Sequence, residues 1–172
     1  MALTLSGTDG ITFNNFTVQA SAGQVLQVTQ TVLNTAFATT STSYTDITGL
    51  SVSITPKFST SKILVLLNIN GSGQDHSSFK LVRGSTTIAV GVPSGTQNAT
   101  TLSNFYLGGN VNISVGGSMT FIDSPATTSA TTYKVQGFVQ SGQLTVNGNG
   151  ANSNNIFVMT SISTITVMEI AG

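Results

Sequence analysis

The chain has 172 residues, of which only 6% are charged, and five basic and five acidic side chains give a formal net charge of zero. This length allows one substantial core, and the mixture of apolar and β-branched residues is typical of a folded chain and not of a disordered one. The lack of net charge and of a basic cluster argues against nucleic acid and anionic membranes as partners. Because the chain has no cysteine, disulfides and thiolate metal sites are excluded.

Residues 1–24 are predicted to form an N-terminal arm. Short strand signals occur at Leu3–Leu5, Ile11–Phe13 and Phe16–Val18, and turn-forming Gly, Asp and Asn residues separate them. Such a stretch is too thin to hold its own core, so it is either a frayed terminus or an arm that becomes ordered against another protein. Residues 1–10 lack the basic start and apolar core of a signal peptide, and we therefore expect synthesis in the cytoplasm without a targeting peptide.

Residues 25–172 are predicted to form one all-β domain. Short apolar runs recur every ten residues or so, separated by Gly, Asn, Asp, Pro or Ser, which is typical of sandwiches and barrels, and no segment has helical periodicity. The pattern indicates an antiparallel β-sandwich, jelly-roll-like, with a short N-terminal β arm. Strands are expected at 25–33, 44–55, 62–70, 79–83, 87–92, 102–107, 118–122, 133–139, 155–159 and 163–170.

The run Lys62–Asn70 is the expected central strand. Ile63, Val65, Leu67 and Ile69 alternate onto one face, whereas Leu64 and Leu66 fall on the other. A strand with apolar residues on both faces needs cover on both sides. The final strand, 163–170, has the same character, which suggests a position at a subunit contact.

Catalytic and metal chemistry have little support in the sequence. The single histidine, His76, is predicted to be a loop residue and not a catalytic base, and the five acidic residues are too widely spaced to suggest a metal site or a carboxylate pair. We therefore expect a protein that is not an enzyme and uses no cofactor and no metal.

The most distinctive polar segment is 147–155, which is rich in asparagine and glycine and is predicted to be a loop. It is either a solvated connection between strands or a polar surface for glycan hydroxyls or a partner's backbone. In the second interpretation the contact residues are Asn147, Asn149, Asn152, Asn154 and Asn155.

Several segments resemble bacteriophage tail-fibre and virion appendage proteins. The resemblance lies in Thr39–Pro56, in Ser61–Asn70 with the following Phe79–Ile88, in the ending Ile165–Ile170 and in the opening Leu3–Ile11, and it extends over most of the chain. The strand order and the segment Tyr44–Ile54 are also similar to the trimeric jelly rolls of the complement C1q and tumour necrosis factor type.

This resemblance implies a non-enzymatic virion protein that forms a homotrimer, whose apolar strands line a shared axis. The first hypothesis is a short tail fibre or fibre tip that contacts a host surface, with a surface glycan as a candidate partner. The alternatives are a capsid decoration (cement) protein and a carbohydrate-binding module. The expected partners are other copies of the chain and other virion proteins, and the residues expected to attach the arm to the virion are Leu3, Leu5, Ile11, Phe13 and Phe16.

Overall fold

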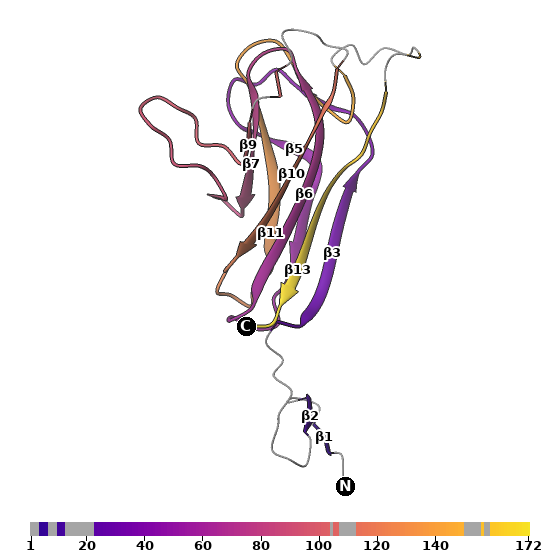
Figure 1. The fold of residues 1–172 in the computed structure, drawn as a ribbon, viewed down its shortest axis with the longest axis vertical. Coiled ribbons are helices and arrows are strands. Elements are labelled where there is room, and N and C mark those ends of the chain that lie inside the picture. Colours follow the sequence, from indigo (N-terminus) through magenta and orange to yellow (C-terminus); the bar gives the residue numbers. More distant parts are fainter. Residues whose placement is uncertain are drawn as a thin grey trace.

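The computed structural model describes residues 4–6, 10–12, 23–103, 105–106, 113–149, 156 and 159–172. These residues form strands and connecting loops, and no helix occurs among them. Two antiparallel sheets pack face to face (Figure 1), which confirms the predicted all-β sandwich. In the described part of the chain there is consequently no helix that could span a membrane.

The six-stranded sheet is built around one long strand, β6 (Lys62–Gly73). One edge of β6 pairs with β13 (Ser163–Ile170), which pairs in turn with β3 (Val25–Leu33). β12 (Leu144–Val146) continues this same edge of β6 at residues 71–73, and β10 (Val115–Asp123) pairs with residues 63–71 along the opposite edge. A short strand, β4 (Phe37–Thr39), completes the sheet beside β12.

The five-stranded sheet has β11 (Thr131–Val139) at its centre. This strand pairs with β5 (Thr45–Ile54) on one edge and with β7 (Ser77–Arg83) on the other. The outer edge of β7 carries two short strands, β8 (Thr86–Ile88) and β9 (Leu102–Ser103). A 13-residue connection, residues 89–101, therefore leaves and rejoins the same edge of the sheet.

The core lies between the two sheets and follows the alternation of the sequence. Its largest fully buried side chains include Tyr133, Phe79 and Leu50 from the five-stranded sheet and Ile63 and Leu67 from β6. Alternate residues of a strand point to opposite faces, so the regular apolar positions of 45–54 and 131–139 all face inward. Burial on this scale is the main source of stability in a chain without disulfides.

The prediction of a central strand is confirmed. Ile63, Val65 and Ile69 are completely buried, and the strand continues three residues beyond the expected end, to Gly73. Leu64 and Leu66 are half-buried on the outer face, and no other described strand covers them, so the expected cover on both faces is not found among the described strands.

Two strands were not predicted from the sequence. β4 and β12 have three residues each, and a run this short has no detectable period. Most of the strand expected at 155–159 lies outside the described residues, and of its two described members Ile156 is in a turn and Met159 is not in a strand.

The arm is described only at β1 (Thr4–Ser6) and β2 (Gly10–Thr12), which pair with each other and with neither large sheet. The first residues of the sandwich lie beside residue 171. The Gly23 amide donates to the Ala171 carbonyl at 2.8 Å, and the Ala171 amide donates to the Gln24 carbonyl at 2.8 Å. The start of β3 and the end of β13 thus lie at one end of the sandwich, the lower end in Figure 1. We call this end the base.

A buried carboxylate fastens the loop after β5 to the base. Glu169 is fully buried, and it accepts hydrogen bonds from the Ser61 hydroxyl at 2.7 Å, the Gln27 amide at 2.6 Å and the backbone amides of Lys57 and Phe58 at 2.6 and 3.4 Å. Burial alone would raise the pKa of Glu169, but these donors outweigh burial and hold the pKa below its usual value. Glu169 is therefore ionised at neutral pH.

A second buried polar cluster joins the two sheets. Arg83 Nη1 lies 2.8 Å from both carboxylate oxygens of Asp123, and the Tyr133 hydroxyl donates to the same carboxylate at 2.7 Å. Burial, followed by the bond to Asp123, raises the pKa of Tyr133 far above its usual value. Tyr133 is thus a permanent donor that links β11 to β10.

Candidate functional site

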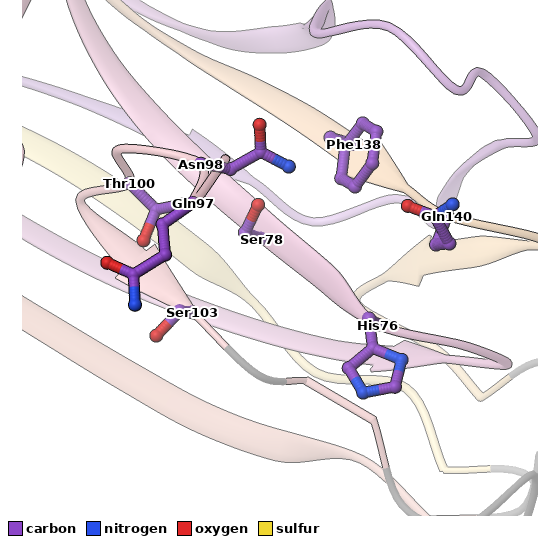
Figure 2. Close-up of a pocket in the computed structure, with 8 residues that line it drawn as sticks. All are labelled: His76, Ser78, Gln97, Asn98, Thr100, Ser103, Phe138 and Gln140. Carbon is purple, nitrogen blue, oxygen red and sulfur yellow. The ribbon is translucent and has the colours of Figure 1, made fainter. Parts of the chain in front are cut away.

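A groove of about 460 Å³ lies on the outer face of the five-stranded sheet (Figure 2). This volume is within the range of about 300–1,000 Å³ that is usual for small-molecule sites. The side chains that line it are amides, hydroxyls, one imidazole and one phenyl ring: His76, Ser78, Gln97, Asn98, Thr100, Ser103, Phe138 and Gln140.

Strand register explains why residues far apart in the sequence meet in this groove. Ser78 is the direct partner of Phe138 on one side and of Ser103 on the other, so the three side chains form one row across β11, β7 and β9. The residues that follow Ser78 and Phe138 in the chain, Phe79 and Val139, point into the core. The row therefore belongs to the outer face, and the core fixes its backbone.

An aromatic pair supports one wall of the groove. The ring of Phe138 stacks on Tyr44, with 5.3 Å between centroids and an interplanar angle of 29°. The Tyr44 and Ser78 hydroxyls are 2.7 Å apart, and Lys80 Nζ lies 3.9 Å from the centroid of the Tyr44 ring. Burial raises the pKa of Tyr44, and the bond with Ser78 lowers it by less. Tyr44 is neutral, and it holds Phe138 in place.

The connection between β8 and β9 forms the opposite wall. Thr101 fixes it to β7, because its backbone amide donates to the Phe79 carbonyl at 2.9 Å and its hydroxyl accepts from the Leu81 amide at 2.9 Å. Near the tip, Gln97 accepts a hydrogen bond from the Ser94 amide at 3.0 Å. These bonds hold Asn98 and Thr100 over the groove, and the Asn98 side chain extends toward Phe138 in Figure 2.

Several polar side chains in the groove make no contact by hydrogen bond with the described part of the chain. Within the described residues, the side chains of Asn98, Thr100, Ser103 and Gln140 make no hydrogen bond. Each can donate and accept, since amides and hydroxyls have both functions. The groove thus presents solvent-accessible hydrogen-bonding groups beside an aromatic face.

His76 lies in the turn between β6 and β7, where the structure places it at the rim of the groove. Its Nδ1 is 2.7 Å from Asp75 Oδ1, and its ring stacks on Tyr106 with 5.1 Å between centroids. The backbone and side-chain hydrogen bonds from His76 lower the pKa of Asp75. The sequence favoured a loop position for His76, and the structure has it there.

The structure places Asn147 inside the domain and not on a solvated loop. The residue is fully buried with a φ of 60°, and its Nδ2 donates to the carbonyls of Leu33 and Thr35 at 2.7 and 3.2 Å. Its Oδ1 accepts from the Ser163 hydroxyl at 2.6 Å, and its backbone amide donates to the Asn70 carbonyl at 2.9 Å. Asn147 therefore connects the ends of β3, β6 and β13, and the expectation of an exposed side chain is wrong for this residue.

Asn149 is also buried, at 2% exposure, so its side chain does not lie on the surface either. The other predicted contact residues, Asn152, Asn154 and Asn155, lie outside the described residues, and their contact with a partner stays a prediction.

The predicted attachment residues are described in part. Leu5 and Ile11 are direct partners in the pairing of β1 with β2. Leu3, Phe13 and Phe16 lie outside the described residues. Attachment through the arm remains a prediction.

A second surface of interest is the outer face of the six-stranded sheet. Register places Val28, Met168, Leu64 and Ile122 in one row across four strands, which we call the apolar row. Val28 is 55% exposed and Ile122 62% exposed. Among the strand residues of this face the charged one is Lys62, at the base, and its ammonium group donates to the Ser124 hydroxyl at 3.0 Å.

The described residues contain no group of three or more His, Asp or Glu side chains that could hold a metal ion. No protein-family model and no curated protein matches the sequence.

The groove was not predicted, because its residues come from three separate segments, 76–78, 97–103 and 138–140. One signal was present in the sequence. In 131–139 the inward positions alternate regularly, which leaves the phenyl ring of Phe138 on the polar face of the strand. A single aromatic residue on a polar strand face is common, so this signal alone does not predict a groove.

Proposed function

We propose that the chain is a non-enzymatic structural protein of a bacteriophage virion, a short tail fibre or fibre tip. In this proposal the arm, residues 1–24, joins the protein to the virion, and the opposite end of the sandwich contacts the host surface. The resemblance of the segments Thr39–Pro56 and Ser61–Asn70 to phage fibre proteins supports it, as does the scarcity of charged residues, which are depleted at the cores of subunit contacts.

One structural observation carries this proposal: the groove lies toward the end of the sandwich opposite the base. β6 begins beside Ile170 at the base and runs 12 residues to Gly73, a length of roughly 40 Å. His76, Ser78 and Gln140 lie at or just beyond that far end. A fibre tip needs this arrangement, in which one end attaches to the virion and the other end recognises the host surface.

The apolar row supports a second part of the proposal, that copies of the chain associate with each other as a homotrimer. Exposed apolar patches on a domain often mark contacts between proteins. The same surface favours the alternative function, a capsid decoration protein, because a neutral sheet face can also lie against a capsid lattice.

Immunogold electron microscopy of intact particles tests the virion proposal. An antibody against the chain should label the tail of the particle. Label distributed over the head would replace the fibre proposal with the decoration protein, and absence of label from purified particles would overturn both.

The non-enzymatic character is tested separately with the purified protein and host surface polysaccharide. We expect no new reducing ends after prolonged incubation. Release of reducing ends in proportion to the protein would show a depolymerase.

A further inference from the structure

We propose that the groove between Phe138 and the 89–101 connection binds a short, neutral oligosaccharide. The inference rests on the proposed function only for the source of the sugar, the host surface. The groove's own chemistry indicates the ligand class.

The groove combines the two kinds of group that a sugar ring needs. A sugar ring has an apolar face of C–H groups and an edge of hydroxyls, and it therefore needs an aromatic surface together with donors and acceptors. Phe138 supplies the aromatic surface, and Asn98, Ser103 and Gln140 supply groups that can both donate and accept. Since these polar side chains are exposed and make no hydrogen bond within the described residues, a ligand would replace water at them without breaking a bond in that part of the protein.

Both walls of the groove are held in place by contacts within the protein. Tyr44 stacks behind Phe138, and Thr101 ties the opposite wall to the core strand β7 at both the Phe79 carbonyl and the Leu81 amide. A site whose walls are already fixed loses less conformational entropy when its ligand binds.

The described lining of the groove contains no Asp, Glu, Lys or Arg. Lys80, two residues along β7 from Ser78, is held over the Tyr44 ring. Recognition of an acidic sugar or a phosphate typically uses Arg or Lys in direct contact with the anion. The lining therefore favours a neutral ligand over an anionic one.

The test is a titration of the full chain, labelled with ¹⁵N, with neutral oligosaccharides of glucose, galactose, mannose, rhamnose and N-acetylglucosamine, and in parallel with sialylated and phosphorylated ones. We expect saturable shifts from a neutral sugar at the amides of 76–78, 97–103 and 138–140. Gln140→Ala and Asn98→Ala should each weaken binding about fivefold, because each removes one hydrogen bond. Phe138→Leu should weaken it at least about tenfold, because it keeps apolar bulk but removes the ring.

Matched controls separate loss of the site from loss of the fold. Phe58, 54% exposed at the base, and Asn68, exposed on the other sheet, offer Phe58→Ala and Asn68→Ala, which should bind like the unchanged protein. Saturation by none of the sugars, binding by anionic sugars alone, or equal weakening by the control variants would overturn the proposal. These outcomes are independent of the immunogold result. The groove proposal can therefore be refuted without refuting the proposed role in the virion.

Discussion

The two outer faces of the sandwich differ in chemistry although the same core supports both. On the six-stranded sheet, the apolar row of Val28, Met168, Leu64 and Ile122 crosses four strands, and charge is confined to Lys62 at the base. On the five-stranded sheet, Asp46 pairs with Lys134 at 2.7 Å, and a groove of amides and hydroxyls lies beside Phe138. The outer face of the six-stranded sheet has the composition of the core of a subunit contact. The outer face of the five-stranded sheet has the composition of a solvent-exposed surface.

The difference shows that alternation in a strand specifies the inward face and leaves the outward face available for selection by function. β6 and β11 both place regular apolar residues inward. The outward residues at the middle of β6 are Leu64 and Leu66, whereas those of β11 include Lys134, Gln136 and Phe138. The residue types on an outer face therefore contribute little to the stability of the domain. They indicate whether that face contacts solvent or another protein.

The strongest test compares adjacent residues of β6 that point to opposite sides. Leu67→Asp should destabilise the protein by more than about 4 kcal/mol, because it buries an unpaired charge beside Ile165. Leu66→Asp, on the outer face, should leave a folded and soluble protein. Thermal unfolding and the soluble yield distinguish them, and equal behaviour of the two variants would refute the assignment of faces.

A second test concerns Glu169, a carboxylate on the inner side of the six-stranded sheet. Glu169→Gln should lower the free energy of unfolding at neutral pH by about 3 kcal/mol, because the four donors lose a charged acceptor. The folded pKa of Glu169 is below the unfolded value of about 4.3. Its contribution is therefore complete above that pH and is lost as the pH falls through the folded pKa.

Urea unfolding at neutral pH and at a series of acidic pH values measures this effect. The stability gap between the unchanged protein and Glu169→Gln should narrow as the solution is acidified. A constant gap would mean that the carboxylate does not titrate as its surroundings require.

A third test breaks the apolar row itself. Ile122→Lys should change the free energy of unfolding by less than about 0.5 kcal/mol, because the residue is largely exposed, but should reduce the oligomer mass in solution. Thr87→Lys, on the outer face of the other sheet, is the matched control and should leave the mass unchanged. Light scattering gives both masses, and a monomeric unchanged protein at every concentration would refute self-association through this face.

The smallest effect is expected on the polar face. Lys134→Ala should cost less than about 0.5 kcal/mol, because the Asp46–Lys134 pair is accessible to solvent and water screens it. A double-mutant cycle with Asp46→Ala measures the coupling. A coupling as large as the effect of Glu169→Gln would show that this face is not solvated, and that the contrast between the two faces is smaller than we infer.

Much of the fold could be predicted from the sequence because long strands have a period. The range 25–33 and the range 163–170 were predicted to the residue, and the central position of 62–70 followed from apolar residues on both of its faces. β4 and β12 could not be found, since three residues carry no period.

The candidate site was less accessible to sequence reasoning. Asn147 looks like a solvated loop residue, yet its amide replaces backbone hydrogen bonds at the junction of three strands, and only the tertiary structure shows this substitution. The groove depends on the register between β7, β9 and β11, which joins residues 25 to 60 positions apart. Local patterns do not encode such pairings.

The placement of β13 has a consequence for how the chain folds. Residues 163–170, made after every other described strand, insert between β3, the first strand of the sandwich, and the central strand β6. Until they are in place, β3 and β6 each expose an unpaired edge, and such edges invite pairing with other chains. Contacts this distant in sequence form slowly. The protein should consequently fold late in synthesis, and a chain shortened before residue 163 should aggregate instead of forming a smaller sandwich.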